Sequence, residues 1–140
     1  MKRVVVDASV VIAALFKDGT VRDVLLNPED ILFQAPAYLR DECTRHIPDV
    51  AARARIPLAT VEAILEDLLS AIESVPPGVY AGSMSRAREL ARGAKALGDE
   101  DNIALALATE APVWTLDRDF RRVASVITLT TKDLSHLGES

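Results

Sequence analysis

The stretch VVVDASVVIAALF, residues 4–16, gives the first indication of the fold. Its three consecutive valines predict a strand that is buried on both faces, and Asp7 ends that strand before a helical segment over 9–15. A basic start followed by an apolar run is also typical of a signal peptide. However, Asp7 interrupts the run, no small-residue cleavage site follows, and the run is too short to cross a membrane. We therefore interpret it as a buried strand leading into a helix.

Helical and extended patterns alternate along the rest of the chain. The clearest is 58–72, where apolar residues recur in steps of three and one, as on one face of an amphipathic helix. This alternation predicts an α/β fold, a three-layer sandwich with a mostly parallel central sheet. No repeat or linker divides the chain, so residues 1–140 are expected to form one domain. Further helices are expected over 20–26, from Pro36 to about His46, over 85–95 and over 99–109, with strands over 31–35, 113–115 and 126–129.

The composition restricts the core and the kind of partner. Hydrophobic residues make up 49% of the 140 residues but aromatic residues only 4%, so the core must be mainly aliphatic, with Cys43 and Trp114 expected inside it. The net charge of -5 counts against nucleic-acid binding unless metal ions and local arginines reverse the field. One cysteine permits no internal disulfide, and no Cys/His zinc spacing exists, so a reducing, cytoplasmic setting is expected.

Acidic residues recur where the predicted strands and helices meet. Asp7 and Asp117 each follow a strand, and functional sites of such sheets lie at the carboxyl ends of their strands. Asp99 is the first of three acids that open the Ala-rich helix, where the helix dipole favours negative charge. Glu42 lies six residues after Pro36 and is expected to lean toward the buried side. The sequence therefore predicts that Asp7, Glu42, Asp99 and Asp117 converge.

Such a grouping needs compensation. Two carboxylates ~4 Å apart repel by about 4 kcal/mol at an effective dielectric constant of 20. Mg²⁺ and Mn²⁺ prefer oxygen ligands, and a pair of them about 3.5–4 Å apart can activate water and stabilise a leaving oxygen. Each acid alone also has an ordinary interpretation, as a helix cap, a dipole residue, a surface glutamate or a turn. The joint placement is what indicates a metal centre.

Three segments resemble the PIN-domain family of ribonucleases, and the resemblance covers nearly the whole chain. Residues 4–16 are similar to that family's first strand, metal-binding aspartate and following helix. PAYLRDEC, residues 36–43, resembles the segment that carries its glutamate. GDEDNIALALATEAPVWTLDRDF, residues 98–120, resembles its C-terminal signature and is the most specific of the three.

The resemblance implies catalytic acids at Asp7, Glu42, Asp99 and Asp117, with Mg²⁺ or Mn²⁺ as the cofactor. Asp99 best fits the family spacing as the third acid, although Glu100 or Asp101 could serve instead. Asp7, Asp99 and Asp117 would bind metal. The further candidates for metal binding are Glu42, Asp101 and Asp119, and those for a supporting role are Thr115 and Ser9.

The resemblance also implies partners. Many short PIN proteins are VapC-like toxins of toxin–antitoxin pairs, which cleave RNA, often form dimers and are silenced by an antitoxin peptide across the site. An RNA substrate, an antitoxin and a second copy of the chain are therefore expected, and no membrane. RNA phosphates could be bound by Arg118, Arg121 and Arg122. They could also be bound by Arg86, Arg88 and Arg92, for which a solvated helix face is the simpler interpretation.

Two other functions compete with a metal-dependent endoribonuclease. One is phosphoryl transfer to an aspartate. A haloacid-dehalogenase-type phosphatase would need a second aspartate two residues after Asp7, where Ser9 stands, and a receiver domain would need an acidic pair at the first strand. The other is a non-catalytic PIN-fold RNA-binding or scaffold protein, against which the full set of acids argues. Hydrolysis of RNA by the toxin of a toxin–antitoxin pair is the favoured hypothesis.

Overall fold

A computed structural model describes residues 1–96 and 98–137. Its strands are β1 (Lys2–Val6), β2 (Ile31–Pro36), β3 (Glu73–Val75), β4 (Val113–Trp114) and β5 (Thr128–Leu129). The helices are α1 (Ala8–Phe16), α2 (Thr20–Leu26), α3 (Leu39–Ala54), α4 (Leu58–Ser70), α5 (Pro77–Tyr80), α6 (Met84–Ala94), α7 (Glu100–Thr109) and α8 (Thr131–Leu137), with the short 3-10 turns η1 (Ala81–Ser83) and η2 (Phe120–Arg122). No helix in this described part is both long and apolar enough to cross a membrane.

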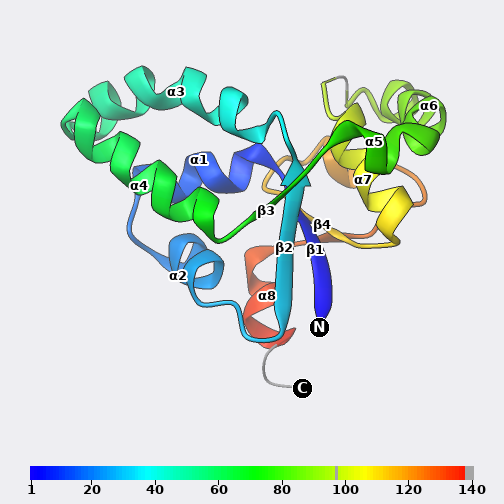
Figure 1. Ribbon diagram of the computed structural model, residues 1–140, viewed down its shortest axis with the longest axis horizontal. Coiled ribbons are helices and arrows are strands. Elements are labelled where there is room, and N and C mark those ends of the chain that lie inside the picture. The colour runs from blue at the N-terminus through cyan, green and yellow to red at the C-terminus, as the bar shows by residue number, and fades with distance from the viewer. Residues whose placement is uncertain (97, 138–140) are drawn as a thin grey trace.

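The five strands form one parallel sheet in the order β3-β2-β1-β4-β5. All carboxyl ends therefore point the same way, upward in Figure 1. Val5 lies beside both Gln34 of β2 and Val113 of β4, so β1 is the central strand. The strand order reverses between β1 and β4, and open α/β sheets bind ligands at such a switch point. The topology thus directs attention to the residues that follow β1 and β4.

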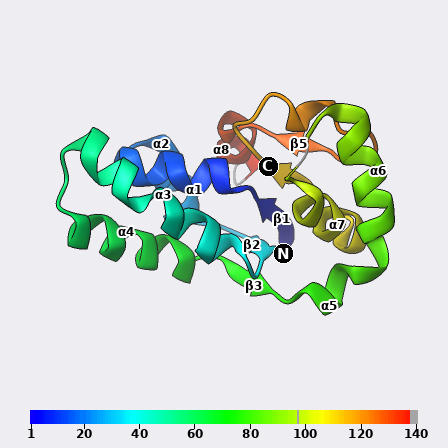
Figure 2. The same cartoon turned by 90° about the horizontal axis from the view of Figure 1, so that it is seen from above.

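Helices cover both faces of the sheet, which confirms the three-layer α/β prediction. Val4 and Val6 pack with α1–α4 and α8 on one face, whereas Val5 packs with α5–α7 on the other. Figure 2, which looks down on the sheet, shows these two groups of helices on opposite sides of β1. Because successive strand residues point to opposite faces, one run of three valines serves both cores. Cys43 and Trp114 are fully buried, as expected.

The structure corrects several predicted boundaries. Pro36 ends β2 instead of opening a helix, and α3 begins only at Leu39 and continues through Pro48 to Ala54. Pro48 lies on the exposed side of α3, where water can bond the carbonyl that the proline leaves unpaired. The short strand β3 and the C-terminal helix α8 were not predicted. By contrast, the predicted α2 and α4 are present with nearly the expected ends.

Candidate metal centre

Asp7 is the acid of the candidate site with the most side-chain hydrogen bonds in the described structure. It directly follows β1, and its backbone N–H donates to the Trp114 carbonyl at 3.0 Å, which fastens it to β4. The side chain is only 5% exposed. Three side chains donate to its carboxylate: Ser9 Oγ at 2.6 Å and Thr115 Oγ1 at 2.8 Å to Oδ2, and Asn102 Nδ2 at 3.1 Å to Oδ1. These bonds offset the cost of burying a carboxylate and fix its direction.

Thr115 and Ser9 join Asp7 to the loop that carries Asp117. The Thr115 hydroxyl, fully buried, accepts the Asp117 N–H at 3.0 Å while it donates to Asp7. Ser9 Oγ accepts the Leu116 N–H at 3.1 Å. The two hydroxyls therefore hold the first turn after β4 against the end of β1. Asp117 itself is exposed, and its Oδ1 accepts the Asp119 N–H at 2.9 Å, so it shapes its own turn as well.

Asp99 and Glu42 approach the same place from α7 and α3. Burial raises the pKa of Asp99 to about 7, and negative charge adds to the effect in the order Asp7, Asp117, Glu42 and Glu100. Burial likewise raises the pKa of Glu42, followed by the charge of Asp7, while Arg45 and His46 act in the opposite direction. The charges of acids from other segments thus add to the effect of burial at Asp99 and at Glu42.

Two residues that the sequence analysis did not propose lie within this field. Burial raises the pKa of the Tyr38 phenol beyond its ordinary range, and the charges of Glu42, Asp101, Asp99 and Asp7 raise it further. Asn102, 3% exposed, donates to Asp7 from the buried side of α7. An amide inside an Ala- and Leu-rich helix was a readable signal for Asn102. Tyr38 had none, because only the folded chain brings the start of α3 to α7.

Asp101 and Asp119, two of the further candidates for metal binding, have other partners. Tyr80, 1% exposed, donates its hydroxyl to Asp101 Oδ2 at 2.7 Å. Asp119 lies 3.8 Å from Arg122 in an exposed ion pair, which contributes little to stability. Glu100, the alternative third acid, accepts the Gly98 N–H at 2.9 Å. At Asp99, by contrast, burial raises the pKa and the charges of Asp7 and Asp117 raise it further.

The carboxylate oxygens of the candidate site are suitable ligands for a hard divalent cation, but they do not form a compact group. Among residues 1–96 and 98–137, no three carboxylate, imidazole or thiol groups are close enough to hold a metal ion jointly. Mg²⁺ needs less, because it keeps several water ligands and is usually bound by one or two carboxylates. Burial first and then the charges of neighbouring acids raise the pKa of Asp99, and a nearby cation would oppose this rise by favouring the ionised carboxylate. In chemistry and charge the residues fit such an ion, with Asp7, Asp99 and Asp117 as the candidate donors.

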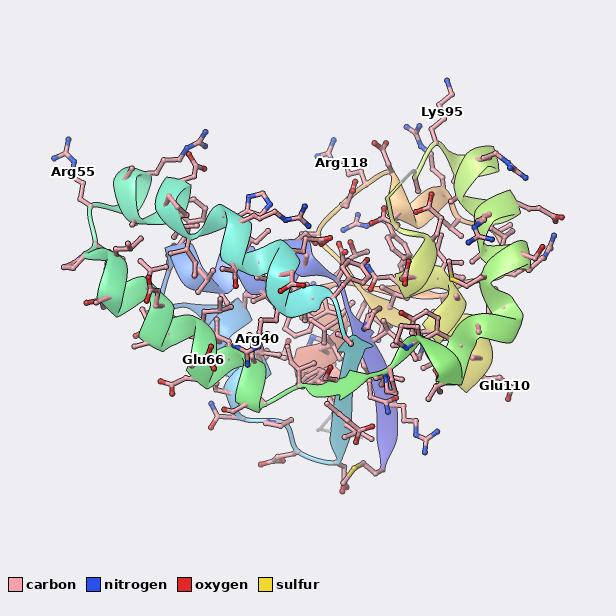
Figure 3. The ribbon with its side chains drawn as sticks, turned by 45° about the horizontal axis from the view of Figure 1, so that its top comes forward. Arg40, Arg55, Glu66, Lys95, Glu110 and Arg118 are labelled. Carbon is pink, nitrogen blue, oxygen red and sulfur yellow. The ribbon has the colours of Figure 1, made fainter. Side chains whose placement is uncertain are left out.

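The arginines of the predicted RNA-binding set follow the Asp117 turn. Arg118 is exposed, and Figure 3 shows it projecting from the same side of the molecule as Lys95. Arg122 is engaged with Asp119, and Arg121 is exposed and adds positive charge near Asp133. All three lie at the molecular surface close in sequence to Asp117.

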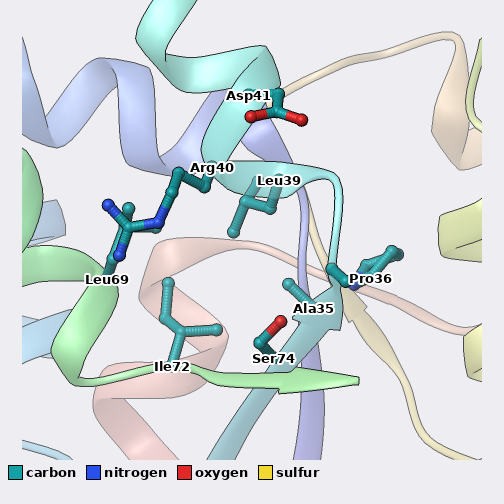
Figure 4. Close-up of a pocket in the computed structure, with 9 residues that line it drawn as sticks. Ala35, Pro36, Leu39, Arg40, Asp41, Leu69, Ile72 and Ser74 are labelled. Atoms are coloured by element: carbon teal, nitrogen blue, oxygen red, sulfur yellow. The ribbon is translucent and has the colours of Figure 1, made fainter. Parts of the chain in front are cut away.

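A small pocket lies apart from the acids. It has a volume of about 140 Å³ and lies at the ends of β2 and β3, between Leu39, Leu69 and Ile72 (Figure 4). Arg40 extends along its rim and pairs with Glu66 of α4. None of the four candidate acids lines this pocket. This pocket is therefore separate from the candidate metal centre.

Comparisons with known proteins agree with this arrangement. The sequence pattern of the PIN domain matches residues 5–137. Comparison with curated proteins gives no match. The crystal structure of VapBC2 from Rickettsia felis bound to a DNA fragment from their promoter is similar with a TM-score of 0.70 and 16% identity, covering 91% of this chain and 98% of that chain. The crystal structure of PAE2754 from Pyrobaculum aerophilum is similar with a TM-score of 0.72 and 16% identity, covering 99% and 91%.

Proposed function

We propose, from the premise that this chain belongs to the PIN-domain family, that it is an endoribonuclease that needs Mg²⁺ or Mn²⁺ to hydrolyse RNA phosphodiester bonds. The observation that carries the proposal is the electrostatic coupling of four acids at the switch point of the sheet. Burial raises the pKa of both Asp99 and Glu42, the charge of Asp7 raises both further, and the charge of Asp117 adds to the effect at Asp99. Perturbed carboxylates at such a position are typical of functional sites.

When bound, divalent cations would supply an activated water molecule and neutralise the charge of the leaving oxygen. The protein's own contribution is orientation. Ser9, Thr115 and Asn102 hold the Asp7 carboxylate in one direction, so it need not reorganise when a ligand arrives. Asp99 must lose its proton before it can bind a cation, and the charge of that cation would favour the loss. We assign Asp7, Asp99 and Asp117 to cation binding, with Glu42 completing the set.

We further propose that the protein is the toxin of a toxin–antitoxin pair, and that an antitoxin and a second copy of the chain are its protein partners. The Rickettsia felis structure contains VapBC2 with promoter DNA, which makes an antitoxin the first partner to look for. A neighbouring gene whose small product binds this chain and stops RNA cleavage would support the assignment. Light scattering of the purified chain would test the dimer.

The test of the nuclease is RNA cleavage by matched variants. Asp7→Asn and Asp117→Asn should abolish cleavage in Mg²⁺ or Mn²⁺, since each removes a charged ligand while keeping the side chain's size. Asp67→Asn, an exposed acid on α4, is the control and should cleave like the original protein. Undiminished, metal-independent cleavage by both site variants would contradict the metal mechanism. A chain that binds no cation at millimolar concentration and cleaves no RNA would instead be a PIN-fold binding or scaffold protein.

A further inference from the structure

Helix α6 concentrates positive charge in an acidic protein. From Met84 to its C-cap Lys95, it carries four cations, Arg86, Arg88, Arg92 and Lys95, against the single acid Glu89, whereas the whole chain has a net charge of -5. Its apolar side, which includes Leu90 and Ala91, is buried. The arginines are exposed on the other side. The helix therefore presents a basic surface that takes no part in the packing of the hydrophobic core.

Arg88 and Arg92, like Lys95, are members of this surface whose side chains are unpaired in the described part of the chain. Arg86 forms an exposed ion pair with Glu89 at 3.3 Å. The side chains of Arg88 and Arg92, one helical turn apart, make no hydrogen bond or ion pair with any residue that the structure describes. Residues four apart on a helix lie side by side, so the two guanidinium groups form one locus of positive charge that no direct ion pair with a described residue neutralises.

That locus adjoins the candidate metal centre. Arg88 and Arg92 line a pocket of about 350 Å³ with Met84, and its opposite wall is Glu100 and Asp101 in the first turn of α7. Figures 1 and 2 show α6 lying alongside α7. One oxygen of each wall carboxylate is already bonded, to the Gly98 N–H and to the Tyr80 hydroxyl. Asp99, which immediately precedes this turn, is a member of the candidate metal centre.

We propose that Arg88 and Arg92 bind backbone phosphates of the RNA strand next to the cleaved bond. The inference rests on the proposed function. A cluster of carboxylates repels a polyanion, so the strand must be held by cations that lie outside the cluster but beside it. Guanidinium groups bind phosphate in two-pronged hydrogen bonds, and a pair spaced by one turn suits a chain of repeated phosphates. Apart from Met84, charged residues line the pocket, and its two guanidinium groups match the charge of a nucleic acid backbone.

The test separates binding from cleavage. Binding of a fluorescent single-stranded RNA of mixed sequence is measured by anisotropy over a potassium chloride series, in protein that also carries Asp7→Asn to prevent cleavage. Arg88→Ala with Arg92→Ala should weaken binding about tenfold or more and lower the salt slope by about 1.4, since each phosphate that is no longer neutralised lowers it by about 0.7. Arg88→Lys with Arg92→Lys keeps both charges and should retain the salt slope.

A matched control removes the same charge elsewhere. Arg53 and Arg55 lie at the far end of α3, and Figure 3 shows Arg55 at the opposite side of the molecule from Lys95. Arg53→Ala with Arg55→Ala should leave RNA binding nearly unchanged. Equal weakening by both pairs, or unchanged binding after removal of the Arg88 and Arg92 side chains, would overturn the inference. RNA cleavage is measured in parallel in protein that keeps Asp7. Cleavage that is unchanged after substitution of Arg88 and Arg92 would refute this inference but not the proposed nuclease. RNA binding that depends on these arginines, without any cleavage, would refute the nuclease.

Discussion

Replacing Asp99 by asparagine should stabilise the protein when no metal is present. The pKa of Asp99 rises from 3.8 to about 7, mainly through burial and then through the charge of Asp7. A carboxyl group whose pKa is raised by folding destabilises the folded state wherever it is ionised. The penalty is absent below about pH 4, grows as the pH rises toward 7, and is constant above that value.

The size of the penalty follows from the shift. Three pKa units correspond to about 4 kcal/mol, and because Asp99 is only half-buried, solvent screening reduces the expected effect to about 2 kcal/mol. Asparagine has the same shape and is an equally good residue at the N-cap of α7. With a urea slope of about 2 kcal/mol per molar, Asp99→Asn should raise the unfolding midpoint by about 1 M at pH 8.

The assay is urea unfolding in EDTA at pH 4 and pH 8, followed by the fluorescence of the single tryptophan, the buried Trp114. Asp99→Asn should gain stability at pH 8 and hardly any at pH 4. Asp67→Asn, an exposed acid on α4, should change little at either pH. Saturating Mn²⁺ should reverse the order at pH 8 by stabilising the original protein more than the variant. A gain that is equal at both pH values would refute the reasoning, because it would not arise from carboxylate repulsion.

Three further changes probe the surroundings of the site. Thr115→Val removes the hydroxyl that joins Asp7 to the Asp117 turn. RNA cleavage should fall about 10- to 100-fold and should require a higher Mn²⁺ concentration. An unchanged metal requirement would show that this hydroxyl does not orient the Asp7 carboxylate. Tyr80→Phe leaves Asp101 without its hydroxyl donor and should lower the free energy of unfolding, measured in urea, by about 1–2 kcal/mol. RNA cleavage should be unchanged. Loss of cleavage would indicate that Asp101 belongs to the metal centre. The Cys43 thiol, whose pKa burial raises to about 12, should react very slowly with a disulfide reagent at pH 8 in the native protein, and rapid modification would mean that α3 opens.

The parts of the fold that local patterns specify were predictable. The valine run of β1 and the apolar stripe of α4 are both visible in the sequence because each element carries its own periodicity. β3 is different, since it has three residues and exists through its pairing with β2, where Gln34 also donates to the Glu73 carboxylate at 2.8 Å. Such a strand depends on a partner far along the chain. The extension of α3 past Pro48 was likewise hidden, because proline usually ends a helix and only tertiary packing shows that it does not here.

The candidate site divides in the same way. Asp7 and Asp117 could be placed from the ends of their strands, and the structure locates both where β1 and β4 are joined. The position of Glu42 relied on the family resemblance, since nothing local distinguishes it from a surface glutamate. Tyr38 could not be found, because the influence of Asp99 and Asp101 on it depends on how the fold places the starts of α3 and α7. Patterns in the sequence locate residues along an element, whereas coupling between elements requires the fold.

Diffraction from crystals soaked in millimolar Mn²⁺ tests the central claim most directly, because the anomalous signal locates the metal without reference to activity. The account predicts a manganese peak at the carboxyl ends of β1 and β4, with Asp7, Asp99 and Asp117 as its nearest protein ligands, and no such peak in Asp7→Asn crystals. A peak elsewhere on the surface, or a peak at this site that survives Asp7→Asn unchanged, would contradict it.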